Sequence, residues 1–338
     1  MFLAMGGGGD VVLASTLALS YERCGGKSFI GSIAWERYVV DPIPGPIPIN
    51  SIINAVERGF GYVVVSRDSF ALRGGRVVVP QAVNVSRILG KPISVLDLYL
   101  GAKGLSEAVK EFADRYGIDV VIGVDVGGDS VAEGYEEDLW SPLADAVVAA
   151  ALAHIPRACI AVASPGADGE LPQRVVEKRL RRIARLGGYI GGYVLSRKDI
   201  DVLRHILSAT ISEASTIPLL VVDTDLDNVS IRHGSRRVEL SMLSLAVFIL
   251  DAVTVVRDSL ARYVYDTQSL DEARKILNAL NIVTEYDLEE EIFKELLARG
   301  SYVELDLVQL RDRLRKKILQ HHTKISKELI LSDHRDQV

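Results

Sequence analysis

Short apolar segments that end in glycine-rich turns constrain the fold of this chain more than any other feature. Segments Phe2–Met5, Ile118–Val124 and Ala158–Ala163 have the length and the apolar composition of buried strands, and glycines follow each of them closely. Helical segments such as 106–116 and 142–154 separate these strands. This alternation predicts a mainly parallel sheet with right-handed crossovers and helices on both faces. We therefore expect an α/β, Rossmann-like fold.

The remaining segments extend this prediction along the chain. Asp10–Arg23 is expected to be a helix that its first residue caps, and Gly187–Tyr193 is expected to be a flexible turn. Residues 229–240 have the pattern of a hairpin, and much of the chain beyond them is helical. We expect a Rossmann-like domain over residues 1–265, with the hairpin inserted near 229–240, and a helical C-terminal extension over 266–338.

The composition argues against several classes of protein. The formal net charge of -6 disfavours a general nucleic-acid binder, which needs a basic surface. Cys24 and Cys159 lack the spacing of metal ligands and are expected to be reduced thiols. The most apolar stretch, Leu240–Val256, is shorter than the roughly 20 residues of a membrane span and contains Asp251. No secretion signal is visible, so we expect a cytoplasmic protein that crosses no membrane.

The first glycine-rich turn, Gly6–Asp10, lies between a predicted strand and a predicted helix. Glycines let a backbone approach a ligand closely, and the free N–H groups of a following helix suit phosphate or carboxylate. The dinucleotide fingerprint is incomplete, because Val11 and Val12 stand where its third glycine would be. Glu36 follows the second strand, where a ribose-binding acid could lie. The turn therefore indicates an anion or nucleotide loop, and a plain tight turn is the alternative.

The densest acidic region of the chain lies between residues 125 and 145, which contain no Lys or Arg. Two adjacent glycines, Gly127 and Gly128, bend the chain so that Asp125 and Asp129 can point at one centre. Carboxylates in this arrangement bind Mg²⁺ or Mn²⁺ or act as acid/base groups, and they repel one another unless a cation or a proton intervenes. The alternative is an acidic surface loop that caps the next helix.

The third turn, Ser164–Glu170, follows the next strand. Since the carboxyl ends of parallel strands meet at one edge of a sheet, all three turns are expected to converge on one crevice at a switch point. A plain connecting loop is the alternative for this turn. The expected catalytic residues and metal ligands are Asp125 and Asp129, and the expected ligand-binding residues are Gly6, Gly7, Gly8, Gly9, Asp10, Gly127, Gly128, Ser164 and Gly166.

These motifs resemble those of one protein family. The opening Gly-Gly-Gly-Gly-Asp, the central run 124–129, Gly134-x-Glu136 and the segment 141–145 are similar to an archaeal family known as domain of unknown function 1152. The resemblance covers about residues 1 to 310; it implies a Rossmann-like fold and supplies no activity.

A more distant similarity is to glutamate cyclase-like proteins, which place an Asp and paired glycines near a metal. Asp125, Gly127 and Gly128 would be the matching positions in this chain. Asp129 stands where an Asn-Glu pair would begin in those proteins, and this departure puts the metal and the lyase chemistry in question.

The functional prediction follows from the convergent turns. We expect a small anionic metabolite or a nucleotide at the carboxyl edge of the sheet, with Mg²⁺ or Mn²⁺ in hydrolase- or lyase-type chemistry. The alternative is a non-catalytic nucleotide- or metabolite-binding protein, which the lack of a recognisable nucleophile favours. An assembly role for the proline run 42–48 or the basic C-terminal segment, including formation of a homo-oligomer, stays open.

Overall fold

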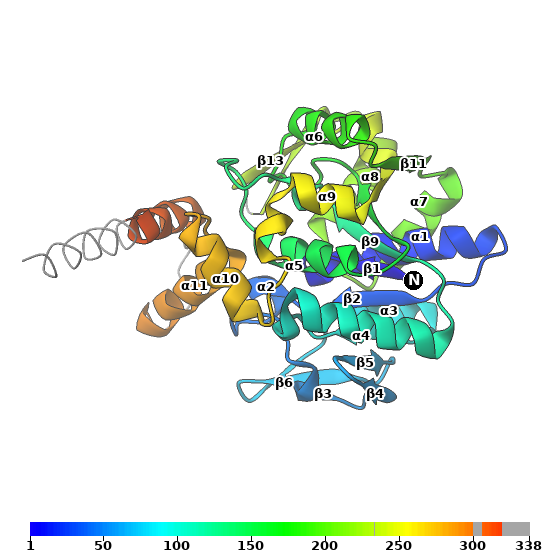
Figure 1. Cartoon of the computed structure of the whole chain (residues 1–338), viewed down its shortest axis with the longest axis horizontal. Coiled ribbons are helices and arrows are strands. Elements are labelled where there is room, and N and C mark those ends of the chain that lie inside the picture. Colours follow the sequence, from blue (N-terminus) through cyan, green and yellow to red (C-terminus); the bar gives the residue numbers. More distant parts are fainter. Residues whose placement is uncertain (233, 300–305, 320–338) are drawn as a thin grey trace, which may run out of the picture.

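A central nine-stranded sheet organises the molecule in the computed structural model, which describes residues 1–232, 234–299 and 306–319 (Figure 1). The strand order is β11-β14-β10-β9-β1-β2-β8-β5-β4. These strands are β1 Phe2–Ala4, β2 Ile30–Ile33, β4 Glu57–Gly59, β5 Tyr62–Val65, β8 Ile93–Leu96, β9 Val121–Val126, β10 Ala158–Ala163, β11 Tyr189–Val194 and β14 Ala246–Asp251.

The five strands β8, β2, β1, β9 and β10 form a parallel core within this sheet. In chain order their arrangement is third, second, first, fourth, fifth, so the direction of winding reverses between β1 and β9. Such a reversal creates the switch-point crevice of doubly wound folds at the carboxyl ends of the strands. The predicted mainly parallel, Rossmann-like sheet is therefore confirmed, with antiparallel strands added at both sides.

Helices cover both faces of the sheet, as expected. One apolar cluster packs α4, α5, α6, α9 and α10 against one face, and a second packs α1, α3, α7 and α8 against the other. The bounds are α1 Val11–Arg23, α3 Gln81–Leu89, α4 Gly101–Tyr116, α5 Pro142–Ala153, α6 Gln173–Arg185, α7 Arg197–Leu207, α8 Glu213–Asp223, α9 Ala252–Asp258 and α10 Leu270–Ala279.

Shorter elements complete the fold. The predicted hairpin is confirmed as β12 and β13, and a small sheet that sequence patterning did not reveal contains β3, β6 and β7. These elements are β3 Ile52–Ile53, β6 Phe70–Arg73, β7 Arg76–Val78, β12 Asn228–Ile231, β13 Arg236–Glu239, α2 Arg37–Val40 and α11 Glu285–Arg299, with 3-10 turns at Gly8–Asp10, Ile49–Ser51, Leu98–Leu100, Asp129–Val131, Met242–Leu245 and Leu260–Val264.

The C-terminal part of the described chain is helical, as expected. It contains α10, α11 and a helix over 307–319, which lie together at one end of the molecule in Figure 1. The predicted basic segment extends beyond residue 319, outside the described residues. The division into domains at residue 265 stays a prediction. Within the described chain, no helix has the length and apolarity needed to cross a membrane.

Two local predictions were wrong. Residues 189–194 form the edge strand β11, because β14 offers a free backbone edge that pairs with them antiparallel. Asp10 does not cap α1 through its side chain, since its carboxylate accepts a hydrogen bond from the Gly6 N–H at 3.1 Å. Cys24 and Cys159 are both free, as expected.

Candidate functional site

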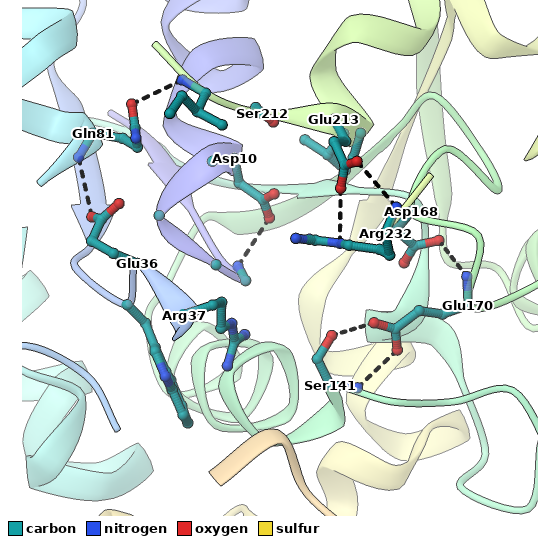
Figure 2. A pocket seen from close by; sticks show the side chains of 18 of the residues that line it. Asp10, Glu36, Arg37, Gln81, Ser141, Asp168, Glu170, Ser212, Glu213 and Arg232 are labelled. Carbon is teal, nitrogen blue, oxygen red and sulfur yellow. Dashed lines mark hydrogen bonds and ion pairs between the residues drawn. The ribbon is translucent and has the colours of Figure 1, made fainter. Parts of the chain in front are cut away.

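A cavity of about 260 Å³ lies at the carboxyl ends of β1 and β9, at the predicted switch point. The loops after β1, β2, β9 and β10 contribute to its wall, together with the start of α8 and the β12–β13 hairpin (Figure 2). Ligand pockets commonly have about 300–1,000 Å³. The size therefore favours a small metabolite over a dinucleotide.

Carboxylates from the end of β9, the turn that follows it, the start of α5 and the loop after β10 gather at this cavity. Oxygen atoms of Asp125, Asp129 and Asp145 lie within 4.8 Å of one another, and so do oxygen atoms of Asp129, Asp168 and Glu170. Asp129 belongs to both groups and lines the cavity. Asp125 and Asp129 thus lie close together, as predicted, and Asp129 is the residue that the two carboxylate groups share.

Asp125 has a different position from Asp129. Its fully buried carboxylate accepts hydrogen bonds from the backbone N–H groups of Gly128 at 3.0 Å and Ser130 at 3.1 Å, and from the Ser130 hydroxyl. Asp125 is not among the lining residues of the cavity. It holds the loop after β9 in the conformation that presents Asp129.

Asp145 is a site residue that the sequence prediction did not select. It lies in the first turn of the buried helix α5, and its buried Oδ1 atom has no hydrogen-bond partner within the described part of the chain. Asp145 Oδ2 and Asp10 Oδ2 each lie 2.7 Å from the point that a Cβ on Gly6 would occupy. Gly6 therefore leaves room for two carboxylates to approach each other, which is a specific reason for a glycine there.

Burial and mutual repulsion determine the electrostatics of this group. Burial raises the pKa values of Asp129, Asp145 and Asp168 well above their usual range, and neighbouring carboxylates raise them further. Burial and the charge of Asp125 raise the pKa of Asp10 to about 8. Buried carboxylates without a counter-charge are costly, so a proton or a cation stabilises such a group.

Glu170 differs from these aspartates because a guanidinium and several hydrogen-bond donors offset the negative charge of its carboxylate. Burial raises its pKa, but the Arg236 guanidinium at 2.9 Å and the N–H groups of Trp140 and Ser141 outweigh that effect and lower the pKa overall. Its carboxylate is therefore ionised and committed to protein groups. It anchors the loop after β10 to the start of α5.

Basic side chains form the rest of the wall. Arg37 stacks on Trp35, with the guanidinium carbon 4.2 Å from the ring centroid, and Arg232 and Arg236 come from the β12–β13 hairpin. None of the three was selected from the sequence. The hairpin lies far along the chain from the strands of the site, so local patterning carries no signal that places its arginines here.

Glu36 lines the cavity near the end of β2, the region where sequence analysis placed a ribose-binding acid. Its buried carboxylate accepts a hydrogen bond from the Gln81 N–H at 3.1 Å, and burial raises its pKa to about 8. A Cβ on Gly8 would lie 2.5 Å from Glu36 Oε1, so a larger residue at position 8 would require the Glu36 side chain to move. A ribose contact stays a prediction.

Ser164 and Gly166 lie behind the cavity wall. The buried Ser164 hydroxyl donates to the Ser244 carbonyl at 2.6 Å, and the Gly166 N–H donates to the Gly127 carbonyl at 2.6 Å. Neither residue is among those that line the cavity. They connect the loop after β10 to that after β9.

Replacing Gly127 by alanine is expected to reduce the free energy of unfolding by about 3 kcal/mol or more. Gly127 has a φ of +129°, and a Cβ there would lie 2.3 Å from the Asp168 carboxyl carbon. Gly25 is a matched control, because it also has positive φ (+89°) but nothing within 4 Å of its Cβ position. Gly25→Ala should cost only about 1 kcal/mol. Urea denaturation of both variants tests this difference, and equal losses would contradict the packing argument.

The comparisons with known proteins add one finding. The model of a family described as a protein of unknown function (DUF1152) matches residues 1–293, a range that includes every site residue described above. No curated protein and no solved structure matches the chain.

Proposed function

The chain belongs to the DUF1152 family, whose description names no activity, and we propose that it is a divalent-cation-dependent enzyme acting on a small anionic metabolite. The observation that carries this proposal is the pair of carboxylate groups that share Asp129 at the switch point. A cluster of acids alone would be weak support. The buried Asp145 Oδ1 atom makes no hydrogen bond to any described residue, and this provides a second and independent indication of a ligand.

The donor set fits a hard cation. Mg²⁺ and Mn²⁺ prefer carboxylate oxygens, and both are usually held by few protein carboxylates with water and substrate completing the shell. Asp129 and Asp145 are the best candidates for direct ligands, because both line the cavity and lie within 4.8 Å of each other. Asp10 also lines the cavity, and its Oδ2 atom lies 2.7 Å from the same Gly6 Cβ position as Asp145 Oδ2.

The remaining side chains suit proton transfer. A cation bound here would polarise a substrate oxygen or activate a water molecule. Asp168 lines the cavity, and burial raises the pKa of its carboxyl well above the usual range, which is the direction that a general acid requires. Its Oδ1 atom accepts a hydrogen bond from the Glu170 N–H at 3.0 Å, which fixes its orientation. This arrangement supports hydrolase- or lyase-type chemistry.

The experiment that tests the proposal combines cation binding with a search for turnover. The protein is treated with EDTA, titrated with Mn²⁺ by calorimetry, and then assayed on phosphorylated and carboxylated metabolites with and without the cation. We expect saturable Mn²⁺ binding with a Kd in the micromolar range and turnover only in the presence of the cation. Absence of Mn²⁺ binding up to millimolar concentration would overturn the proposal. Ligand-induced thermal stabilisation without any turnover would favour the non-catalytic alternative.

A further inference from the structure

The arginines of this protein fall into two groups that differ in how well their N–H donors are satisfied. Arg73 is a structural arginine: it bonds to the Asp41 carboxylate at 2.8 Å and to several backbone carbonyls. Arg179 likewise bonds to the Val131 carbonyl and to Asp258. A guanidinium has five N–H donors, and these two direct them at protein acceptors. The arginines of the cavity wall are different.

Arg37 has a buried donor that makes no hydrogen bond to the described residues. This Nη1 atom lies 3.4 Å from Glu285 Oε1 as part of a long ion pair, and Nη2 donates a hydrogen bond to the same oxygen at 3.4 Å. The Trp35 ring on one side and the backbone of Gly7, whose Cβ position lies 3.4 Å from Nε, hold the guanidinium in place. The residue also has a φ of +58°, a strained conformation for a non-glycine residue. The protein therefore holds this guanidinium at the cavity wall while its Nη1 atom makes no hydrogen bond to the described residues.

The two hairpin arginines repeat this pattern. Arg236 Nη1 contacts Glu170 at 2.9 Å and donates to the Asp168 carbonyl at 3.0 Å, while its buried Nε atom makes no hydrogen bond to the described residues. The Arg232 guanidinium forms a long ion pair with Glu213 at 3.4 Å. In Figure 2 the Arg232 side chain extends across the cavity towards Asp10, and Arg37 points into the same space. Burial lowers the pKa of Arg232, and the nearby charges of Arg236 and Arg37 lower it further.

The glycine loop itself is unsuited to an anion. The sequence analysis assigned the anion to the glycine loop and the start of α1. In the structure the Asp10 carboxylate occupies that position and accepts a hydrogen bond from the Gly6 N–H. Asp145 adds a second carboxylate 2.7 Å from the Gly6 Cβ position. An anion at the glycine loop would meet two carboxyl groups and would repel their ionised forms, so the guanidinium donors are its better partners.

We propose that Arg37, Arg232 and Arg236 bind a phosphate group of the metabolite in the same cavity as the cation ligands Asp129 and Asp145. This inference rests on the proposed function and narrows its substrate class. A phosphate dianion offers three terminal oxygens, enough to receive donors from several guanidinium groups and still contact a cation. A carboxylate has only two oxygens and one negative charge, so it would leave donors unsatisfied. The substrate class is therefore small phosphate monoesters.

The test measures binding of orthophosphate, with succinate as the comparison anion, by calorimetry in the presence of Mn²⁺. The wild-type protein should bind orthophosphate at least tenfold more tightly than succinate. Arg232→Gln should weaken orthophosphate binding at least tenfold and leave Mn²⁺ affinity unreduced. Arg232 is the best choice because its side chain is half-buried and lightly bonded, so the variant should fold. Arg237→Gln is the matched control, since Arg237 is exposed on the same hairpin, and its orthophosphate affinity should not change.

The outcomes separate the two proposals. If succinate binds as tightly as orthophosphate, or if Arg232→Gln has no effect, the phosphate assignment is overturned while cation-dependent activity stands. If orthophosphate binds through Arg232 but Mn²⁺ does not bind, the proposed function fails and the arginine subsite stands. Arg37→Gln provides a second test of the subsite, with thermal unfolding to verify that the variant is folded.

Discussion

Replacing Asp129 by asparagine is expected to weaken Mn²⁺ binding by at least 100-fold and, at the same time, to make the cation-free protein more stable. Asp129 is common to both carboxylate groups, so its charge contributes to any cation bound there. A 100-fold loss corresponds to about 2.7 kcal/mol, a reasonable effect for removing one charged ligand. No other single substitution in the site should affect cation binding as strongly.

The expected gain in stability of Asp129→Asn also comes from removing the charge of this carboxylate. In the absence of a cation, burial and the charges of Asp145 and Glu170 raise the pKa of Asp129 well above its usual range. The folded state therefore has to keep this carboxyl protonated or tolerate repulsion. Asparagine removes the charge and offers an amide N–H to the neighbouring carboxylates. We expect the free energy of unfolding in EDTA to rise by about 1–2 kcal/mol, as is common when a strained functional group is neutralised.

Calorimetric titration with Mn²⁺ and urea denaturation in EDTA measure the two effects separately. Asp225→Asn is the control, because Asp225 is an exposed carboxylate outside the cavity. It should change neither quantity. If Asp129→Asn binds Mn²⁺ like the wild type, Asp129 is not a ligand. If it is strongly destabilised in EDTA, the carboxylate has a structural role like that of Asp125.

The sheet and the location of the site could be predicted because both depend on local patterns. A segment rich in β-branched residues such as 121–126 predicts a strand, and strands that alternate with helices predict a parallel order. From there, the convergence of Gly6–Asp10 and Gly127–Asp129 follows from topology alone. Asp145 was also within reach of this reasoning, since the first turn of a helix that follows β9 faces the same edge of the sheet.

The arginine wall could not be predicted in this way. Arg232 and Arg236 lie on a hairpin that three helices and a strand separate from the loop after β10. The positions of Arg236 beside Glu170 and of Arg232 beside Glu213 depend on tertiary packing. The edge strand β11 was missed for a similar reason: Gly191 and Gly192 suggest a turn until the unpaired edge of β14 is known. The distant similarity to glutamate cyclase-like proteins stays a prediction, as no finding tests it.

The second large effect concerns pH: Glu36→Gln is expected to stabilise the cation-free protein at about pH 8.5 and to have little effect at about pH 5. Burial raises the pKa of Glu36 from 4.5 to about 8 in the folded protein. Below the pKa of 4.5 in the unfolded state, Glu36 is protonated in both states and does not destabilise the fold. Between pH 4.5 and about 8 the folded state keeps a proton that the unfolded state releases, so the free energy of unfolding falls as the pH rises. Above about pH 8 the destabilisation by Glu36 reaches its full value.

Glutamine reproduces the protonated form, because its carbonyl can still accept the hydrogen bond from the Gln81 N–H. Each pKa unit corresponds to about 1.4 kcal/mol, so we expect Glu36→Gln to gain about 2 kcal/mol or more at about pH 8.5. Urea denaturation in EDTA at several pH values measures this difference, with Glu239→Gln at an exposed position as the control. If the stability difference between Glu36→Gln and the wild type does not vary with pH, the raised pKa of Glu36 is contradicted. A loss of stability at high pH would mean that Glu36 is ionised in the fold, with the Arg37 charge outweighing its burial.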